Sequence, residues 1–189
     1  MAIAGLGGIG SWVALYLAIS RLAGKLELVD FDYVESHNLH RTPYRPEHIC
    51  MLKAKALRNI IKEHAPEVEV TIYPYPLEKV IDRLESEVMV EATDSTMIQG
   101  LLHEWLRRER RLVTVHYDGE SITIGVNLVP GAWEIGKPPT GYQTAPVYVA
   151  TPAVAAALAV HILTWGNIID GSLLFRSTLS DIVASGRRG

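Results

Sequence analysis

A glycine motif near the start of the chain constrains the fold more than any other sequence feature. Gly5-x-Gly7-x-x-Gly10 lies between a short apolar run, 2–4, and a segment of helical period, 11–23. In that context Gly5 permits a tight turn, Gly7 lets the backbone approach a phosphate, and Gly10 lets helix and strand pack closely. The helix N-terminus offers unpaired N–H groups to the phosphate. The motif predicts a nucleotide in a Rossmann-like crevice, and it fits NAD and ATP equally well.

The rest of the chain alternates apolar runs of strand length with longer segments of helical period. This alternation is typical of an α/β fold with a Rossmann-like, mainly parallel sheet flanked by helices. Asp118-Gly119 between two apolar runs predicts a hairpin, so antiparallel strands should extend the sheet in the C-terminal part. We expect a single domain over residues 1–189, with long loops at 31–46 and 130–146. The expected strands are 2–4, 26–29, 68–73, 88–90, 112–116, 121–128, 173–177 and 181–184, and the expected helices are 11–23 (with Gly24 as C-cap), 49–64, 77–84, 97–108 and 152–165.

Composition narrows the class of protein further. A net charge of −3 gives no general attraction to nucleic acid or to an anionic membrane. Cys50 is the single cysteine, which excludes an internal disulfide and a multi-cysteine zinc site. The chain reaches its glycine motif too early for a signal peptide, and its longest apolar stretch, 152–163, is too short to span a bilayer. We therefore expect a cytoplasmic protein with no zinc and no membrane partner, and nucleic acid is an unlikely partner.

Charged residues after the glycine motif distinguish between the two nucleotides. Asp30 ends the second expected strand, where a carboxylate can accept hydrogen bonds from ribose hydroxyls. Arg41 lies in the loop that follows, Lys53 near the start of the next helix, and Asp94 after a later strand. A dehydrogenase has no need of these three groups beside the phosphates. Nucleotidyl transfer does need them, because cations neutralise the developing phosphate charge and a carboxylate holds Mg²⁺.

In combination, these segments resemble the ThiF/MoeB-type adenylyltransferases, relatives of the ubiquitin-activating enzymes. The resemblance covers nearly the whole chain. It rests on Gly-Leu-Gly-Gly-Ile-Gly-Ser at 5–11, Val-Asp-Phe-Asp-Tyr-Val at 29–34, Asn-Leu-His-Arg at 38–41, Lys-Ala-Lys-Ala at 53–56 before Ala-Pro at 65–66, Ala-Thr-Asp-Ser at 92–95, and Thr-Ala-Pro at 144–146 before an Ala-rich helix.

The resemblance implies a role for each of these residues, with ATP and Mg²⁺ as cofactors. The nucleotide would bind to Gly5, Gly7, Gly8, Gly10, Asp30 (at the ribose), Asp32, Asn38 and Arg41 (at the phosphates), and Lys53 (at the α-phosphate in the transition state). Asp94 would hold Mg²⁺, and Arg41, Lys53 and Asp94 would form the catalytic set. Lys55 competes for the role of Lys53, whose distance from Ala65-Pro66 matches the family better.

The implied reaction is the activation of a C-terminal carboxylate. The partner would be a ubiquitin-like or sulfur-carrier protein, whose carboxylate is ionised at neutral pH and needs no general base. It would displace pyrophosphate from ATP and form an acyl-adenylate. The family further implies a homodimer, or a heterodimer with a related subunit.

The sequence departs from the family pattern in three ways. Many relatives carry an N-terminal segment whose arginine reaches the ATP site, so here another chain supplies that arginine, or catalysis is weaker, or the start is lost. The paired Cys-x-x-Cys motifs that bind zinc are missing. There is also no cysteine after Asp94 to form a thioester or persulfide, and we expect Cys50 to be a buried small residue. We therefore expect the reaction to stop at the adenylate.

Other interpretations of the same residues remain open. Asp30, Asp32 and Asn38 also suit turns, Asp94 suits a helix N-cap, and Arg41 and Lys53 suit a solvated surface. Three further functions compete with the adenylyltransferase. These are a tRNA-acting relative that uses the same ATP chemistry, a non-catalytic scaffold subunit, and an NAD-linked oxidoreductase that leaves Lys53 and Asp94 without a role.

Overall fold

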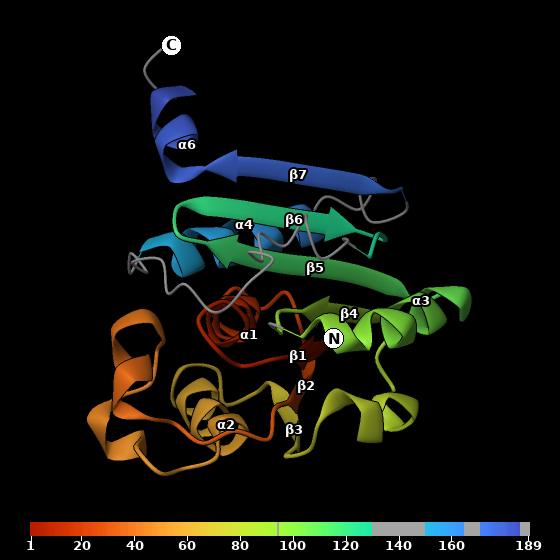
Figure 1. Ribbon diagram of the computed structural model, residues 1–189. Helices are drawn as coiled ribbons and strands as arrows, with labels where there is room; N and C mark the ends of the chain where they lie inside the picture. Colours follow the sequence, from red (N-terminus) through yellow and green to blue (C-terminus); the bar gives the residue numbers. More distant parts are fainter. Residues whose placement is uncertain (94, 130–149, 165–170, 186–189) are drawn as a thin grey trace.

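The computed structural model describes residues 1–93, 95–129, 150–164 and 171–185 (Figure 1). These residues form a seven-stranded sheet of order β3-β2-β1-β4-β5-β6-β7 with helices on both faces. The strands are β1 (Ala2–Ala4), β2 (Lys25–Val29), β3 (Glu69–Tyr73), β4 (Val88–Glu91), β5 (Arg111–Asp118), β6 (Ser121–Val126) and β7 (Leu173–Thr178). The helices are α1 (Gly10–Ile19), α2 (Lys53–His64), α3 (Gln99–Arg107), α4 (Ala150–Thr164) and α6 (Leu179–Ser185), with 3₁₀ turns η1 (Ser36–Arg41), η2 (Pro46–His48), η3 (Leu77–Lys79), η4 (Ile81–Arg83) and η5 (Thr96–Ile98).

The sheet is parallel from β3 to β5 and antiparallel from β5 to β7, as the sequence predicts. The predicted hairpin joins β5 to β6, where Asp118 pairs with Ser121 and Gly119 has a φ of +57°. Only Gly, Asn and Asp adopt such a φ readily, which explains the Asp-Gly signal. Because β1, β2 and β4 are parallel neighbours, the segments that follow them meet at one edge of the sheet.

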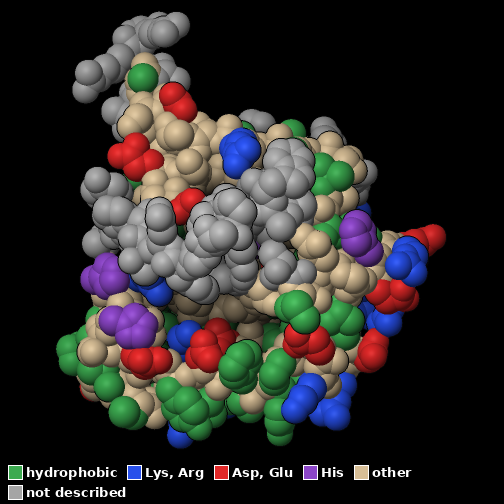
Figure 2. Space-filling view, in the orientation of Figure 1, with side chains coloured by type: hydrophobic (Ala, Val, Ile, Leu, Met, Phe, Trp, Pro, Cys, Tyr) green, Lys and Arg blue, Asp and Glu red, His purple; other side chains and the backbone are tan. Residues whose placement is uncertain are grey.

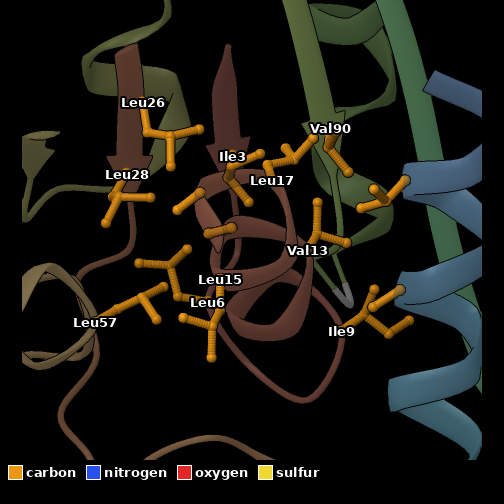
Figure 3. Packing of buried hydrophobic residues seen from close by; sticks show 14 of the residues in the cluster. Ile3, Leu6, Ile9, Val13, Leu15, Leu17, Leu26, Leu28, Leu57 and Val90 are labelled. Carbon is orange, nitrogen blue, oxygen red and sulfur yellow. The ribbon is translucent and has the colours of Figure 1, made fainter. Parts of the chain in front are cut away.

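The two faces of the sheet bury separate apolar clusters. Alternate strand residues such as Ile3, Leu28 and Val90 point towards α1, and Figure 3 shows Leu57 of α2 joining them. The opposite face buries Met89 and Leu112 under α3, η3 and η4. Burial on both faces accounts for the continuous apolar runs of these short strands. Within the described residues, no helix combines the length and hydrophobicity needed to cross a membrane.

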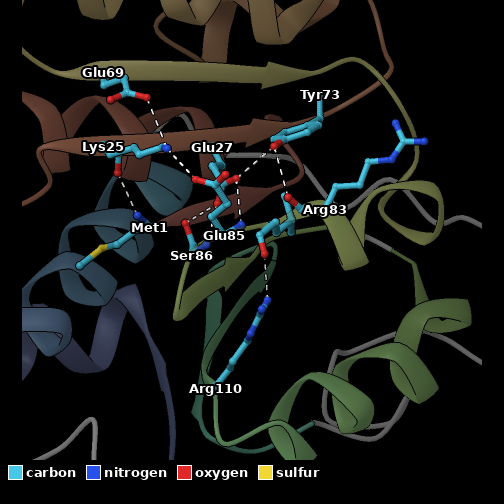
Figure 4. A network of polar contacts seen from close by, with 10 residues as sticks. Met1, Lys25, Glu27, Glu69, Tyr73, Arg83, Glu85, Ser86 and Arg110 are labelled. Carbon is cyan, nitrogen blue, oxygen red and sulfur yellow. Dashed lines mark hydrogen bonds and ion pairs between the residues drawn. The ribbon is translucent and has the colours of Figure 1, made fainter.

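A buried carboxylate fastens the N-terminal side of β4 to β2. Glu27 accepts hydrogen bonds from the Ser86 hydroxyl (2.5 Å), the backbone N–H groups of Ser86 (2.9 Å) and Glu85 (3.2 Å), and the Tyr73 hydroxyl (3.2 Å) (Figure 4). Although burial raises the pKa of Glu27, these donors outweigh burial and the pKa lies below its usual value.

Helix α1 ends four residues earlier than predicted, at Ile19 rather than 23. Arg21, and not the predicted C-cap Gly24, takes a left-handed conformation after the helix, with a φ of +57°. Its N–H donates to the Ala18 carbonyl, and the Leu22 N–H donates to the Leu17 carbonyl. This pair of bonds is the Schellman motif, formed here without a glycine.

The segment before α2 also differs from the prediction. Helix α2 begins at Lys53 rather than 49, because Cys50 has a φ of +67° and its N–H bonds to the Val34 carbonyl. The prediction of a buried Cys50 is wrong, since this residue is exposed. The predicted helix at 77–84 is in fact two 3₁₀ turns separated at Val80, whose φ of −129° interrupts helical geometry.

The last predicted strand, 181–184, is wrong as well. Residues Leu179–Ser185 form α6, which follows β7 directly. The Asp181 carboxylate accepts a hydrogen bond from the Thr178 hydroxyl at 2.7 Å, and the Asp181 N–H donates to that hydroxyl oxygen at 3.1 Å. Thr-x-x-Asp at 178–181 is a helix-start pattern that outweighs the apolar residues after it.

Candidate active site

Two adjoining cavities lie where β1, β2 and β4 end. The first, of about 420 Å³, has the apolar residues Val29, Phe31, Tyr75 and Leu77 in its lining. The second, of about 230 Å³, is lined mostly by polar groups from η1, the glycine loop and the end of β5. Gly7, Asp32, Lys53 and Ala92 line both cavities. Figure 2 shows the molecule in the orientation of Figure 1, and in the lower half of this view hydrophobic side chains are interleaved with acidic and basic ones.

The glycine loop has the geometry that the motif predicts. Gly5 has a φ of +82°, and a Cβ there would lie 2.7 Å from the Ala92 carbonyl oxygen. A Cβ on Gly10 would overlap the Gly5 carbonyl, so β1 and α1 approach closely only with glycine at this position. A Cβ on Gly7 would meet only open space, whereas a Cβ on Gly8 would lie 3.1 Å from the Tyr117 hydroxyl and 3.2 Å from Pro152. Gly5, Gly7 and Gly8 line the cavities, whereas Gly10 serves the packing beneath them.

Asp30 ties the glycine loop to the end of β2. One carboxylate oxygen accepts from the Leu6 N–H at 2.6 Å and the other from the Asp32 N–H at 2.8 Å. Asp30 is 8% exposed, and burial raises the pKa of its carboxyl although the Lys53 ammonium lowers it. Since each carboxylate oxygen can accept more than one hydrogen bond, Asp30 keeps acceptor capacity on the cavity it lines.

Lys53 lies at the junction of the two cavities. Its ammonium pairs with the Asp32 carboxylate at 2.8 Å, and its backbone N–H donates to the Asp32 carbonyl. The Lys53 side chain is 11% exposed and that of Asp32 is 51% exposed. Lys55, the competing lysine, is exposed and lines neither cavity. The start of α2 at Lys53 therefore places this lysine, and not Lys55, at the cavities.

Arg41 and Asn38 reach the second cavity from η1. The Arg41 Nε is buried and has no hydrogen-bond partner among the described residues. Its backbone is fixed by Trp12, whose indole N–H donates to the Arg41 carbonyl at 3.0 Å. The Asn38 side-chain oxygen accepts from the Glu35 N–H at 3.1 Å, so this residue also caps η1. A half-buried guanidinium whose Nε–H is an unused buried donor suits an anionic ligand.

Asp94, the predicted magnesium ligand, lies outside the described residues, as does the loop at 130–146. The turn on its N-terminal side is fixed by Glu91, a buried residue that the sequence analysis did not single out. The Glu91 carboxylate accepts from the Thr93 N–H and from the Thr93 hydroxyl, both at 2.6 Å. Its other oxygen lies 3.3 Å from Nε2 of His116.

Tyr44 is another residue of this region that sequence reasoning missed. Its buried hydroxyl donates to the Leu6 carbonyl at 2.8 Å and lies 3.5 Å from the Lys53 carbonyl. Burial, with a further contribution from Asp30, holds the pKa of Tyr44 well above its usual value. The available signal is a tyrosine in the polar stretch 35–48, which has no Phe, Trp or other Tyr, because such a residue often anchors a loop to the core.

The arrangement suits an anionic ligand that extends between the cavities. The first cavity offers apolar and aromatic walls to a ring system, and the second offers Arg41 and open backbone of the glycine loop to phosphates. Lys53, which lines both cavities, can contact the part of the ligand that lies between the ring system and the outer phosphates. Of the described residues predicted for the site, all except Gly10 therefore line at least one of the two cavities.

Comparison with known sequences finds relatives among adenylyltransferases and activating enzymes. MOCS3 of Aedes aegypti, an adenylyltransferase and sulfurtransferase, is 31% identical over 106 residues, which cover 54% of this chain and 24% of that protein. Ubiquitin-like modifier-activating enzyme 5 of Caenorhabditis elegans is 35% identical over 75 residues, which cover 40% of this chain and 18% of that protein. The chain thus spans about a quarter or less of the length of these curated relatives.

Solved structures share the fold at lower identity. A crystal structure of Escherichia coli MccB with ATP has a TM-score of 0.72 and 18% identity, and covers 94% of this chain and 63% of MccB. A PaaA structure has a TM-score of 0.71 and 22% identity, and covers 95% of this chain and 60% of that one. The model of the ThiF family matches residues 1–114, a range that contains the glycine loop, Asp30 and Lys53. Since that match covers more than half of the sequence, the chain belongs to the ThiF family.

Proposed function

We propose that this chain binds ATP and adenylates the C-terminal carboxylate of a ubiquitin-like or sulfur-carrier protein. The observation that carries the proposal is the meeting of the glycine loop, Asp30, Lys53 and Arg41 at two joined cavities. Relatives named for adenylyltransferase and for ubiquitin-like modifier activation support the same reaction class. An NAD-linked oxidoreductase would leave the cations of the second cavity without a role.

The adenosine occupies the first cavity, with its ribose at Asp30, and the phosphates extend past Lys53 towards Arg41. The carrier's carboxylate attacks the α-phosphorus, a P–O bond forms, and the bond to pyrophosphate breaks. Lys53 neutralises charge at the α-phosphate, and Arg41 neutralises charge on the leaving pyrophosphate. Asp94 would hold Mg²⁺, which supplies further positive charge to the phosphates. The reaction stops at the acyl-adenylate, because the single cysteine precedes Lys53 in the sequence and lines neither cavity.

Exchange of labelled pyrophosphate into ATP tests the proposal, since adenylation is reversible. We expect exchange when a sulfur-carrier protein with a free C-terminus is added, and none with the same carrier amidated at its C-terminus. Equal exchange with both forms would contradict carboxylate activation. ATP binding without exchange, for a panel of ubiquitin-like and sulfur-carrier proteins, would favour the non-catalytic scaffold. Exchange that depends on tRNA would favour the tRNA-acting relative.

A further inference from the structure

Glu91 and His116 form a buried pair beside the second cavity that the proposed chemistry leaves unused. Glu91 is 1% exposed and His116 is 5% exposed, and their side chains come from the neighbouring strands β4 and β5. His116 lines the cavity, and its Nε2 has no well-aligned hydrogen bond although it lies 3.3 Å from the Glu91 carboxylate. Buried polar atoms are normally hydrogen-bonded, so a buried pair whose Nε2 lacks a well-aligned hydrogen bond at a cavity wall needs an explanation.

The strand order places this pair on the opposite side of the glycine loop from the cations. The loop follows β1, the segment with Arg41 and Lys53 follows β2, and His116 lies near the end of β5. In the sheet, β2 flanks β1 on one side, and β4 and then β5 lie on the other. The second cavity therefore carries Arg41 and Lys53 on the β2 side, with the carboxylates of Asp32 and Glu35 beside them, and His116 on the β5 side.

Phosphoryl and nucleotidyl transfer place the attacking and leaving oxygens roughly in line, on opposite sides of the phosphorus. Arg41 attracts the leaving pyrophosphate to the β2 side, so the attacking carboxylate must come from the β5 side. We propose that His116 is a specificity-determining residue that binds the terminal peptide unit of the acyl substrate, and that Glu91 is the positioning residue that orients it. This inference rests on the proposed adenylation.

The hydrogen-bonding chemistry of the pair gives the Glu91 carboxylate its positioning role. An ionised carboxylate only accepts hydrogen bonds, so it selects the imidazole form with the proton on Nε2. Nδ1 is then left to accept a hydrogen bond from the last N–H of the substrate chain. Because the other oxygen of Glu91 holds Thr93, the carboxylate cannot turn away from His116 without losing those two bonds.

The walls near His116 also limit the size of the acyl group. Gly7, Gly8 and Ala92 line the same cavity, and a Cβ on Gly8 would already meet the Tyr117 hydroxyl at 3.1 Å. The cavity has about 230 Å³ for the phosphates and the acyl end together. A terminal residue without a side chain fits this space best, so the acyl probe that tests His116 ends in glycine.

Two adenosine probes separate acyl recognition from nucleotide recognition. The N-acetylglycyl sulfamate of adenosine is a stable mimic of an acyl-adenylate that ends in one peptide unit, and the plain sulfamate of adenosine lacks that unit. Binding of both is measured by calorimetry for wild type, Glu91→Gln and His116→Gln, with His103→Gln on the exposed face of α3 as control. Glu91→Gln keeps an oxygen for Thr93 but presents an N–H group to His116, which reverses the imidazole tautomer.

We expect both variants to bind the acetylglycyl probe about tenfold more weakly, the effect of one lost hydrogen bond, while the plain sulfamate binds as in wild type. His103→Gln should bind both probes normally. Equal loss for the two probes would indicate a merely structural pair and overturn the inference, as would no loss for either. If the wild-type protein binds neither probe, the proposed function itself is contradicted. If the wild-type protein binds both probes and the variants bind them equally well, only the role of His116 is contradicted.

Discussion

Glu27 in β2 and Asp30 just after it are both buried carboxylates, and their surroundings differ. Glu27 accepts four hydrogen bonds from groups of the fold, and its pKa lies below the usual value. Asp30 accepts two, from the Leu6 and Asp32 N–H groups, and burial keeps its pKa above the usual value. Glu27 lies outside both cavities, whereas Asp30 lines the larger one.

The difference shows how the fold divides structural from functional polar groups. The fold supplies Glu27 with enough donors to offset its desolvation, so the residue stabilises the junction of β2, β3 and β4. Asp30 is desolvated without being fully satisfied, which costs stability and leaves acceptors for a ligand. An under-satisfied buried carboxylate at a cavity is therefore a better guide to the site than burial alone.

The largest expected effect comes from Glu27→Ala. This change leaves two backbone N–H groups and two hydroxyls without their shared acceptor, and we expect it to lower the free energy of unfolding by about 3–5 kcal/mol. Urea unfolding measures the loss. Glu27→Gln, which keeps one acceptor oxygen, should lose less. A loss below about 1 kcal/mol for Glu27→Ala would show that water replaces the carboxylate at no cost.

We expect Asp30→Asn to affect folding less than Glu27→Ala does, and to weaken ligand binding more. The amide accepts only one of the two backbone hydrogen bonds, so we expect a loss of about 1–3 kcal/mol in unfolding free energy. ATP should bind at least about tenfold more weakly, since the ribose loses its acceptor and the glycine loop its anchor. Calorimetric titration with ATP and Mg²⁺ measures the affinity. Unchanged affinity would remove Asp30 from the site.

Lys53→Met and Lys55→Met provide a matched pair with a smaller expected effect on folding. We expect Lys53→Met to lower ATP affinity by about tenfold, because a charge-assisted contact to phosphate is lost. Folding stability should change by less than about 1 kcal/mol, since the partner Asp32 is half exposed and becomes solvated. Lys55→Met should bind ATP as wild type does. The reverse order of affinities would assign the phosphate contact to Lys55.

The smallest effect is the pH dependence of stability, where the two carboxylates have opposite signs. The folded pKa of Asp30 is raised, so its contribution to stability falls as pH rises from about 4 through that pKa. The folded pKa of Glu27 is lowered, so its contribution is present above about pH 4.5 and is lost as pH falls through the lowered pKa. Unfolding curves of wild type, Asp30→Asn and Glu27→Gln at several pH values between 3 and 7 should show these opposite slopes. Slopes of the same sign would contradict the comparison.

Local chemistry made much of the sheet and the glycine loop predictable from the sequence. The glycine spacing, the alternation of apolar runs and Asp118-Gly119 each carry a backbone requirement that few other residues meet. The predictions failed where a residue without a strong propensity took an unusual conformation. Arg21 and Cys50 both have positive φ, and no sequence pattern marks them.

The predicted site residues belong to the glycine motif or to the polar and charged positions that follow the strands, and the residues that hold them in place were missed. Tyr44, Trp12 and Glu91 act through long-range contacts to the Leu6 carbonyl, the Arg41 carbonyl and His116. These partners depend on the packing of α1, η1 and β5, which the spacing of residues in the sequence does not define. Thr178-x-x-Asp181 is different, because its helix-start signal is present in the sequence and the strand prediction at 181–184 overlooked it.

Thermal unfolding in the presence of nucleotide tests most directly whether the carboxyl ends of β1, β2 and β4 form an ATP site. A ligand that binds only the folded state raises the apparent stability by mass action, without need of the carrier protein. We predict that ATP with Mg²⁺ raises the Tm of wild type, that NAD does not, and that Asp94→Ala loses the Mg²⁺-dependent part of the increase. Stabilisation by NAD alone, or no stabilisation by ATP and Mg²⁺, would contradict the assignment of an ATP site to these strand ends.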